Sequence, residues 1–183
     1  MIRLFDVFFS LLGIILLSPI FIILIIAGYF DSRSPIFLQE RMGKNKKPFR
    51  LYKFRSMHIN TKSIATHLVS HSNVTKYGRV IRKTKLDEIP QLFNVLFGDM
   101  SFIGPRPNLF NQEELIIERD KLGVYDVLPG ISGLSQINKI DMSIPKLLSE
   151  TDAKMIKELN TINYFNYIIK TILGKGFGDR VVK

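Results

Sequence analysis

The chain has 183 residues, with 26 Lys or Arg against 16 Asp or Glu, and a formal net charge of +10. Its 46% hydrophobic and 23% charged residues exclude a disordered chain, and a mean hydropathy of +0.13 excludes a protein with many membrane crossings. The absence of Cys excludes disulfide scaffolds, thiol catalysis and Cys-based zinc sites. Because the first 30 residues carry only Arg3 and Asp6, whose charges cancel, the net charge belongs to the other 153 residues. The composition predicts a soluble body with one membrane element.

Residues 4–30 form an apolar run long enough to cross a bilayer, for which about 20 residues suffice. A cleaved signal peptide fits less well, because the run is too long and no small-residue cleavage pattern follows Tyr29. A straight span is the simplest alternative. However, Pro19 lies in the middle of the run, where it should kink or break a helix by losing an amide hydrogen and crowding the carbonyl of Ile15. Ser18 can bond the freed carbonyl.

Basic residues are concentrated directly after this run. Between Arg41 and Leu86 there are 13 Lys or Arg and no Asp or Glu, which is typical of a cytoplasmic segment, and Arg3 marks the other end of the run. We therefore predict a re-entrant membrane helix that breaks at Ser18 and Pro19 and returns to the leaflet it entered. This divides the chain into a membrane helix at residues 1–30, in contact with membrane lipid, and a cytoplasmic domain at residues 31–183.

The remaining elements predict an α+β fold that is mainly helical, with a small β-hairpin and amphipathic interfacial helices. Residues 35–57 indicate the hairpin, and residues 58–76 a polar loop with room for a short helix, whose His residues lack metal-ligand spacing. Apolar spacing predicts helices at 86–97, ending at Gly98, and at 112–121. The apolar residues from Met155 to Ile172 also recur at helical spacing, on a face that packs on the core or lies in the membrane interface.

An acidic pair interrupts the basic region. Asp87 and Glu88 follow 46 residues without a carboxylate, and Pro90 comes two residues later. Proline is tolerated within the first four helical positions, so the helix cap should lie between Leu86 and Ile89. The two carboxylates then sit at a helix start, where the macrodipole favours negative charge and free amides can hold a phosphate oxygen. Ordinary helix capping is the alternative explanation.

Cations surround the pair on both sides in the sequence. Four basic residues lie between Arg79 and Lys85, and the GPRP segment at 104–107 holds Arg106 between two prolines. A carboxylate among fixed cations suits an anionic, phosphorylated substrate with a divalent metal. The alternative is a non-catalytic, membrane-anchored basic protein that binds anionic lipid or nucleic acid through residues 41–85. Such a binder gains nothing from central carboxylates, so the acidic pair favours an enzyme.

The stretch KLDEIPQLFNVLFGDMSFIGPRP, residues 85–107, closely resembles the signature of the bacterial sugar transferase family, the monotopic phosphoglycosyl transferases. The resemblance includes the Ser18-Pro19 pair, the segments around Gln39 and Lys53, and PGISGLSQIN at 129–138. It covers nearly the whole chain and matches the minimal form of the family. One stretch departs from the usual pattern, in which Gly and Arg follow the Gln-x-Asn; here Lys139 follows and is the candidate replacement for that Arg.

The resemblance implies a transferase that moves a sugar 1-phosphate from a UDP-sugar to undecaprenyl phosphate or another polyprenol phosphate, with release of UMP and with Mg²⁺ as cofactor. It implies a monotopic protein on the cytoplasmic face of the bacterial inner (plasma) membrane. The reaction would be the first membrane step in assembly of an O-antigen, a capsule or a glycoprotein glycan. Downstream glycosyltransferases are then expected partners, and nucleic acid is not.

The same resemblance implies roles for individual residues. Asp87 would be the nucleophile that forms a covalent phosphosugar intermediate, and Glu88 would assist through the metal or as a base, which makes both of them candidate metal ligands. The residues expected near the substrate phosphates are Lys53, Arg82 and Arg106. Further expected substrate contacts are Gln136, Asn138 and Lys139.

Overall fold

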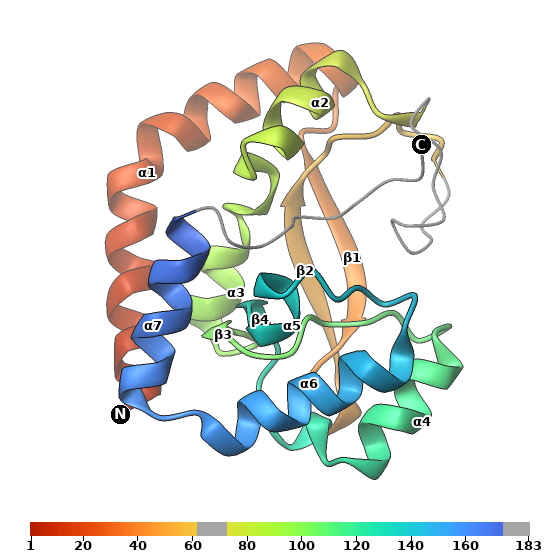
Figure 1. The fold of residues 1–183 in the computed structure, drawn as a ribbon. Coiled ribbons are helices and arrows are strands. Elements are labelled where there is room, and N and C mark those ends of the chain that lie inside the picture. The colour runs from red at the N-terminus through yellow and green to blue at the C-terminus, as the bar shows by residue number, and fades with distance from the viewer. Residues whose placement is uncertain (62–72, 174–183) are drawn as a thin grey trace.

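The computed structural model describes residues 1–61 and 73–173, which form a mainly helical α+β fold with two small sheets (Figure 1). This confirms the predicted fold class. Most of the polar segment predicted as a loop at 58–76, including His67 and His71, lies outside the described residues.

The N-terminal apolar run forms one helix, α1 (Ile2–Ser32), which bends near its middle (Figure 1). Pro19 lies inside this helix, and the Ser18 hydroxyl donates a hydrogen bond of 2.8 Å to the carbonyl of Ile15. That carbonyl is the one that loses its usual donor to proline. Of the expected kink or break, the structure shows the kink: the helix bends without ending, and the Ser18 hydroxyl replaces the missing bond.

A hairpin follows, as predicted. Strands β1 (Ile36–Met42) and β2 (Pro48–Phe54) pair antiparallel, with Gln39 opposite Leu51, around the short 3₁₀ turn η1 (Lys44–Lys46). Alternate residues of a strand point to one face. The inward face of this hairpin therefore presents Gln39, Arg41 and Lys53, all of which are buried.

The acidic pair occupies a 3₁₀ turn that leads into a helix. The elements of this region are α2 (Lys76–Lys83), η4 (Leu86–Glu88), α3 (Gln91–Phe97) and β3 (Ser101–Ile103). The cap of α3 is Pro90, one residue beyond the predicted window, so Asp87 and Glu88 precede the α-helix proper. Gly98 ends α3 in a left-handed conformation, with φ of 95°, as expected of a helix-terminating glycine.

The second half of the chain is also mostly helical. Its elements are α4 (Glu113–Lys121), η5 (Val124–Asp126), β4 (Gly130–Ser132), α5 (Leu134–Ile137), α6 (Pro145–Glu158) and α7 (Thr161–Ile172). The helix expected at 112–121 is α4. A continuous helical face from Met155 to Ile172 is wrong, because the chain turns between α6 and α7, and the Asn160 side chain caps α7 by accepting a hydrogen bond from the amide of Asn163.

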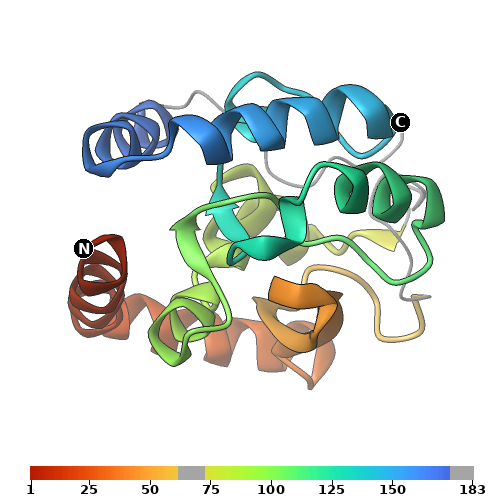
Figure 2. The same ribbon diagram turned by 90° about the horizontal axis from the view of Figure 1, so that it is seen from below.

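The elements form layers around a short parallel pair of strands, β3 and β4. Figure 2 shows α6 and α7 on one side of this pair and the hairpin with α1 on the other. One apolar cluster is buried between β3, α6 and α7, and a second, around Leu51, Val95 and Met100, joins the hairpin to α3. The layers thus bring η4, the inward face of the hairpin and the β3 loop together.

The first turns of α1 are bonded to the rest of the protein. The buried carboxylate of Asp6 accepts hydrogen bonds from the Ser101 hydroxyl (3.0 Å), the Phe102 amide (3.1 Å) and the Tyr164 hydroxyl (2.9 Å). Burial, together with the charge of Asp6 and the hydrogen bond to it, raises the pKa of the Tyr164 phenol, which stays protonated as a donor. Arg3 donates to carbonyls at the C-terminal end of α3, at 2.6 Å from Val95, where a cation is favoured.

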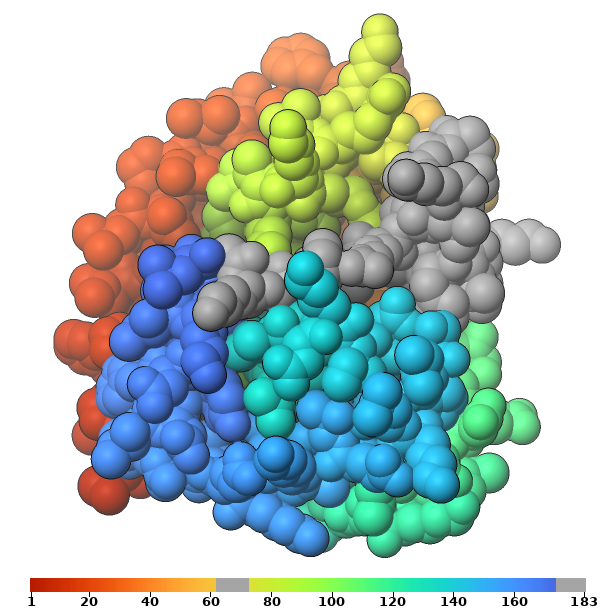
Figure 3. All heavy atoms as spheres, viewed as in Figure 1, coloured from red at the N-terminus to blue at the C-terminus, as the bar shows by residue number. Residues whose placement is uncertain are grey.

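The last turns of α1 touch the same body. The Tyr77 hydroxyl of α2 donates to the carbonyl of Leu24 at 2.9 Å, and Leu24 packs with Phe54 and Ile81. Figure 3 shows α1 along one edge of the molecule beside α7. The opposite face of α1 exposes large apolar side chains, including Phe8, Ile15 and Phe30. Its length and composition would allow it to cross a membrane, and together these features indicate membrane association.

Candidate active site

Glu88 is the meeting point of three segments. One of its carboxylate oxygens, Oε1, lies 2.7 Å from Nη2 of Arg106 and 3.4 Å from Nζ of Lys53. The side chains of Glu88 and Lys53 are about nine-tenths buried, and neighbouring Asp87 is 4% exposed. A buried charge is tolerated only when it is paired. The structure therefore brings Asp87, Glu88, Lys53 and Arg106 together, although they come from η4, β2 and the loop after β3.

A turn in the chain before η4 contributes to this arrangement. Lys85 adopts a left-handed backbone conformation, with φ of 59°, at the residue before η4. Such a conformation is unfavourable for a residue with a side chain, and it lies in the turn that connects α2 to η4. Arg82, at the end of α2, donates to the Ser56 hydroxyl at 3.4 Å. The basic residues that precede the acidic pair in the sequence therefore lie on α2 and on the turn between α2 and η4.

The loop that carries Arg106 packs closely against β4. A side chain at Gly104 would put its first carbon 2.5 Å from the carbonyl oxygen of Leu128 and 2.7 Å from the amide of Gly130, so this position has no room for one. The amide of Gly104 donates to the carbonyl of Ser132, and that of Gly130 to the carbonyl of Pro105. The prolines and these bonds hold the backbone of Arg106 in place.

Two buried arginines hold the same loop from the other side. Arg41 donates to the carbonyl of Pro107 at 3.0 Å, and Arg119 donates to the carbonyl of Arg106 at 2.8 Å. Arg119 also pairs with Asp152 at 2.6 Å, in a contact where both side chains are at most 1% exposed. Asp152 accepts a second hydrogen bond from the Ser135 hydroxyl of α5. One buried carboxylate on α6 therefore links the Arg106 loop to α5.

Sequence reasoning missed Arg119 and Asp152. Arg119 lies in α4, whose charged composition is typical of a solvated helix, and Asp152 lies 33 residues later in α6. No spacing rule connects two such positions. One weak hint of a buried ion pair was present in the sequence, namely the number of charged residues in these helices. Such residues are far more often exposed to solvent than buried.

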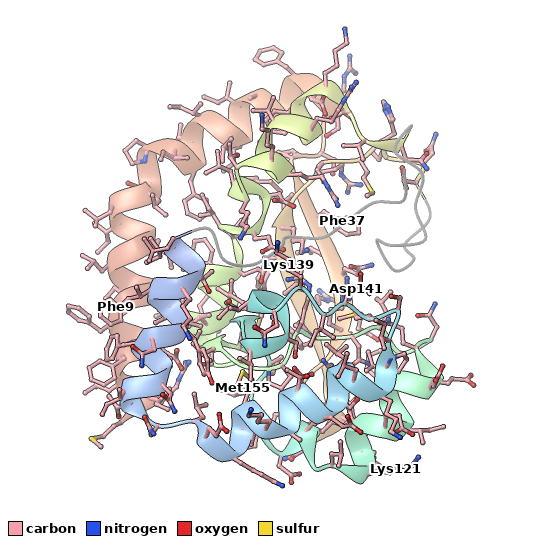
Figure 4. The ribbon with its side chains drawn as sticks, viewed as in Figure 1. Phe9, Phe37, Lys121, Lys139, Asp141 and Met155 are labelled. Carbon is pink, nitrogen blue, oxygen red and sulfur yellow. The ribbon has the colours of Figure 1, made fainter. Side chains whose placement is uncertain are left out.

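The three predicted substrate contacts of the PGISGLSQIN segment separate in the structure. Gln136 is buried and lines a cavity that also contains Glu88. Asn138, which caps the C-terminal end of α5, and Lys139, which follows it and is labelled in Figure 4, are both exposed. Lys139 has a left-handed backbone, with φ of 65°. Gln136 is the one of the three that lines the same cavity as Glu88.

The sequence is similar to a known family of enzymes and to several of its members. The sequence matches the family model described as bacterial sugar transferase over residues 1–176. The chain belongs to the bacterial sugar transferase family. It is 42% identical over 141 residues to a UDP-glucose:undecaprenyl-phosphate glucose-1-phosphate transferase of Klebsiella pneumoniae, an alignment that covers 74% of this chain and 30% of that protein.

Two further relatives carry related names. An Aeromonas hydrophila UDP-N-acetylgalactosamine-undecaprenyl-phosphate N-acetylgalactosaminephosphotransferase is 37% identical over 190 residues, covering 96% of this chain and 44% of that protein. A UDP-glucose:undecaprenyl-phosphate glucose-1-phosphate transferase of Escherichia coli K12 is 40% identical over 139 residues, covering 73% of this chain and 30% of that protein. This bacterial sugar transferase thus spans less than half the length of these relatives.

The donor set of this bacterial sugar transferase fits Mg²⁺. Within residues 1–61 and 73–173 no group of three or more His, Asp or Glu side chains is arranged around one point. Mg²⁺ does not need such a group, because it usually keeps several waters and is held by one or two carboxylates together with substrate phosphates. Asp87 and Glu88 are adjacent carboxylates of this kind, next to cations suited to phosphate.

Proposed function

We propose that the protein transfers a sugar 1-phosphate from a UDP-sugar to a polyprenol phosphate, releases UMP, and forms a covalent intermediate on Asp87. The observation that carries this proposal is the pairing of Arg106 and Lys53 with one oxygen of Glu88, beside the buried Asp87. Family membership and the names of the relatives support the donor and acceptor classes. A pure polyanion binder, the alternative, leaves this central carboxylate pair without a purpose.

Two displacements account for the transfer. A carboxylate oxygen of Asp87 attacks the β-phosphorus of the UDP-sugar, a new P–O bond forms, and the bond to the bridging oxygen breaks so that UMP leaves. An oxygen of the polyprenol phosphate then attacks the same phosphorus and breaks its bond to Asp87. The carboxylate is regenerated and the product is a polyprenyl diphosphate sugar, which remains in the membrane as an acceptor for downstream glycosyltransferases.

The other residues act on charge and position. Arg106 presents a planar guanidinium that can grip two phosphate oxygens at once, and Lys53 adds a compact positive charge. Glu88 fixes both of these cations while the site is empty and assists as a metal ligand or base during transfer. Asp87 and Glu88 would hold Mg²⁺, which when bound neutralises phosphate charge. Arg82 approaches the phosphates from α2.

We further propose that α1 is re-entrant and that the protein is monotopic, with residues 31–183 as the catalytic domain on the cytoplasmic face of the inner membrane. A straight α1 of 31 residues would be roughly 45 Å long and would put its ends on opposite sides of a bilayer. Arg3 donates a hydrogen bond to α3 and the Leu24 carbonyl accepts one from α2, so both halves of α1 are bonded to one body, which argues against that arrangement. Because the chain has no Cys, Cys at Ile2 and at Ser34 should both be labelled by impermeant maleimide in inverted vesicles and neither in intact cells.

The test of the chemistry is intact-protein mass spectrometry in the absence of lipid. The wild type, incubated with Mg²⁺ and a panel of UDP-sugars, is expected to gain the mass of one phosphosugar and to release one equivalent of UMP. Asp87→Asn should do neither and should remain folded. Asp120→Asn is the matched control, since the Asp120 side chain forms an exposed ion pair with Lys46 and does not line the cavity that contains Glu88. Adduct formation by Asp87→Asn, or UMP release by the wild type that requires lipid, would refute the mechanism.

A further inference from the structure

A cavity of about 230 Å³ lies directly beside the acidic pair. Its walls come from seven elements that lie between the N-terminal helix and the last helix of the chain: α1, η4, α3, β3, β4, α5 and α7. Most of the lining is apolar, with Leu17 of α1, Leu92 of α3, Phe102 of β3 and Ile131 of β4. The charged groups in it, Glu88 and Lys85, belong to the turn that carries Asp87. The cavity is thus an apolar chamber with the proposed reaction centre in one wall.

The wall contributed by α1 connects this chamber to the membrane element. Leu17 is two residues before Pro19, where α1 bends, while its neighbour Leu16 is 66% exposed on the outer face of the same helix. One turn earlier, Gly13 lets α1 approach α3 closely, since a side-chain carbon there would lie 3.2 Å from Leu92. The chamber is therefore separated from the apolar outer surface of α1 by a single helix.

A buried polar group in the chamber also indicates a ligand. The side chain of Gln136 is buried, and neither its Oε1 nor its Nε2 has a hydrogen-bond partner among the described residues. An unsatisfied buried amide is costly, and the exceptions call for an explanation. By contrast, the other two polar residues of the wall, Ser132 and Thr171, are bonded to each other at 2.6 Å. Gln136 is the group that a bound substrate would satisfy.

We infer that this chamber binds the isoprene units nearest the phosphate of the polyprenol phosphate acceptor. The inference rests on the proposed function and assigns a place to its second substrate. The apolar wall of Leu17, Leu92 and Phe102 accommodates the hydrocarbon, while the phosphate lies toward Lys85 and the acidic pair, within reach of the Gln136 amide. A UDP-sugar is polar along its length and has no hydrocarbon chain that could pack against the apolar wall.

The size of the chamber fits this assignment. A cavity of about 150 Å³ lined by Leu, Ile and Phe holds one benzene ring, which has six carbons. The chamber here is larger and has room for roughly one to two five-carbon isoprene units. The rest of a long polyprenyl chain must leave between α1 and its neighbours and enter the lipid. Burial of these first units would hold the phosphate near Asp87 and favour attack on the phosphosugar.

Leu17→Trp tests this assignment, because the larger side chain fills the chamber, and Leu16→Trp is the matched control on the lipid-facing side of the same turn. We expect Leu17→Trp to form the phosphosugar adduct from the active UDP-sugar at the wild-type rate. Its KM for undecaprenyl phosphate should rise at least tenfold, with the KM for the UDP-sugar unchanged. Leu16→Trp should behave as wild type in both half-reactions.

The outcomes separate the two proposals. Unchanged KM values in Leu17→Trp would overturn the chamber assignment, and slower adduct formation with a raised KM for the UDP-sugar would assign the chamber to the donor sugar instead. Failure of the wild type to form an adduct would refute the proposed function and not the chamber alone.

A second measurement uses the wild type and does not depend on the folding of a variant. A polyprenyl phosphate with a photoreactive diazirine on its first isoprene unit should label peptides that contain Leu92 or Phe102. Excess undecaprenyl phosphate should suppress this labelling, and the UDP-sugar should not. Labelling confined to outward-facing residues of α1, such as Leu16, would overturn the assignment.

Discussion

Removing Asp152 from its buried pair with Arg119 should lower the free energy of unfolding far more than removing one partner of an exposed pair of nearly the same length. Asp152→Ala removes the partner of a guanidinium that is 1% exposed and also the acceptor of the Ser135 hydroxyl. Breaking a buried pair from one side costs about 3–5 kcal/mol, since the remaining charge is left uncompensated. The exposed pair of Lys46 and Asp120 has nearly the same separation, 2.7 Å against 2.6 Å, so Asp120→Ala is a control matched in geometry and differing in burial. It should cost about 0–1 kcal/mol.

Urea unfolding in one detergent, followed by far-ultraviolet circular dichroism, gives both values. A difference of less than about 1 kcal/mol between the two alanine variants would refute the reasoning from burial. A double variant, Arg119→Met with Asp152→Leu, leaves no unpaired buried charge and should recover much of the stability. The double variant should nevertheless lose UMP release, because Arg119→Met removes the donor to the carbonyl of Arg106. Full activity in the double variant would show that Arg119 does not position the loop.

Three other variants test neighbouring parts of the structure. Arg106→Lys keeps the positive charge but cannot bind two phosphate oxygens in a bidentate manner, so kcat/KM for UMP release should fall at least tenfold. Wild-type rates at all substrate concentrations would contradict this. Gly104→Ala forces a carbon against backbone atoms, so the free energy of unfolding should fall by about 1–3 kcal/mol and the rate of UMP release should fall as well. An unaffected variant would show that the loop can shift to make room for the side chain. Burial and Asp6 raise the pKa of Tyr164, so the folded state holds the phenol proton more tightly than the unfolded state. The free energy of unfolding should therefore fall as the pH rises above about 10, less steeply in Tyr164→Phe, and equal slopes would contradict the assignment.

Local rules succeeded where the cause was local. The apolar run of α1, the hairpin, the stop at Gly98 and the Ser18 bond to Ile15 each depend on residues within a few positions of one another. The resemblance of residues 85–107 to a family signature directed attention to Asp87, Glu88 and Arg106, and the structure brings these three together. Their chemical roles remain predictions.

The rest depends on contacts between distant segments. The parallel pairing of β3 with β4 joins strands of three residues, which are too short to show a period. The break between α6 and α7 occurs inside an apolar pattern that continues through it, and Asn160 is a weak signal on its own. The chamber around Gln136 forms only when seven elements, from α1 to α7, have packed together. Sequence patterns show which side chains are apolar, but they do not show which of these side chains contact one another in the fold.

The bonds that Asp6 makes have a consequence for how the chain is made. Its partners Ser101 and Tyr164 lie 95 and 158 residues further along, so they leave the ribosome long after α1 does. During that interval a carboxylate destined for burial has only water or lipid headgroups around it, which disfavours deep insertion of the first turns of the helix. Contacts of α1 with α2, α3 and β3 can form earlier, but the bond from Tyr164 to Asp6 must wait until α7 has been synthesised. Maturation of this protein should thus proceed in two stages, with loose surface attachment first and closure of the body onto the helix afterwards.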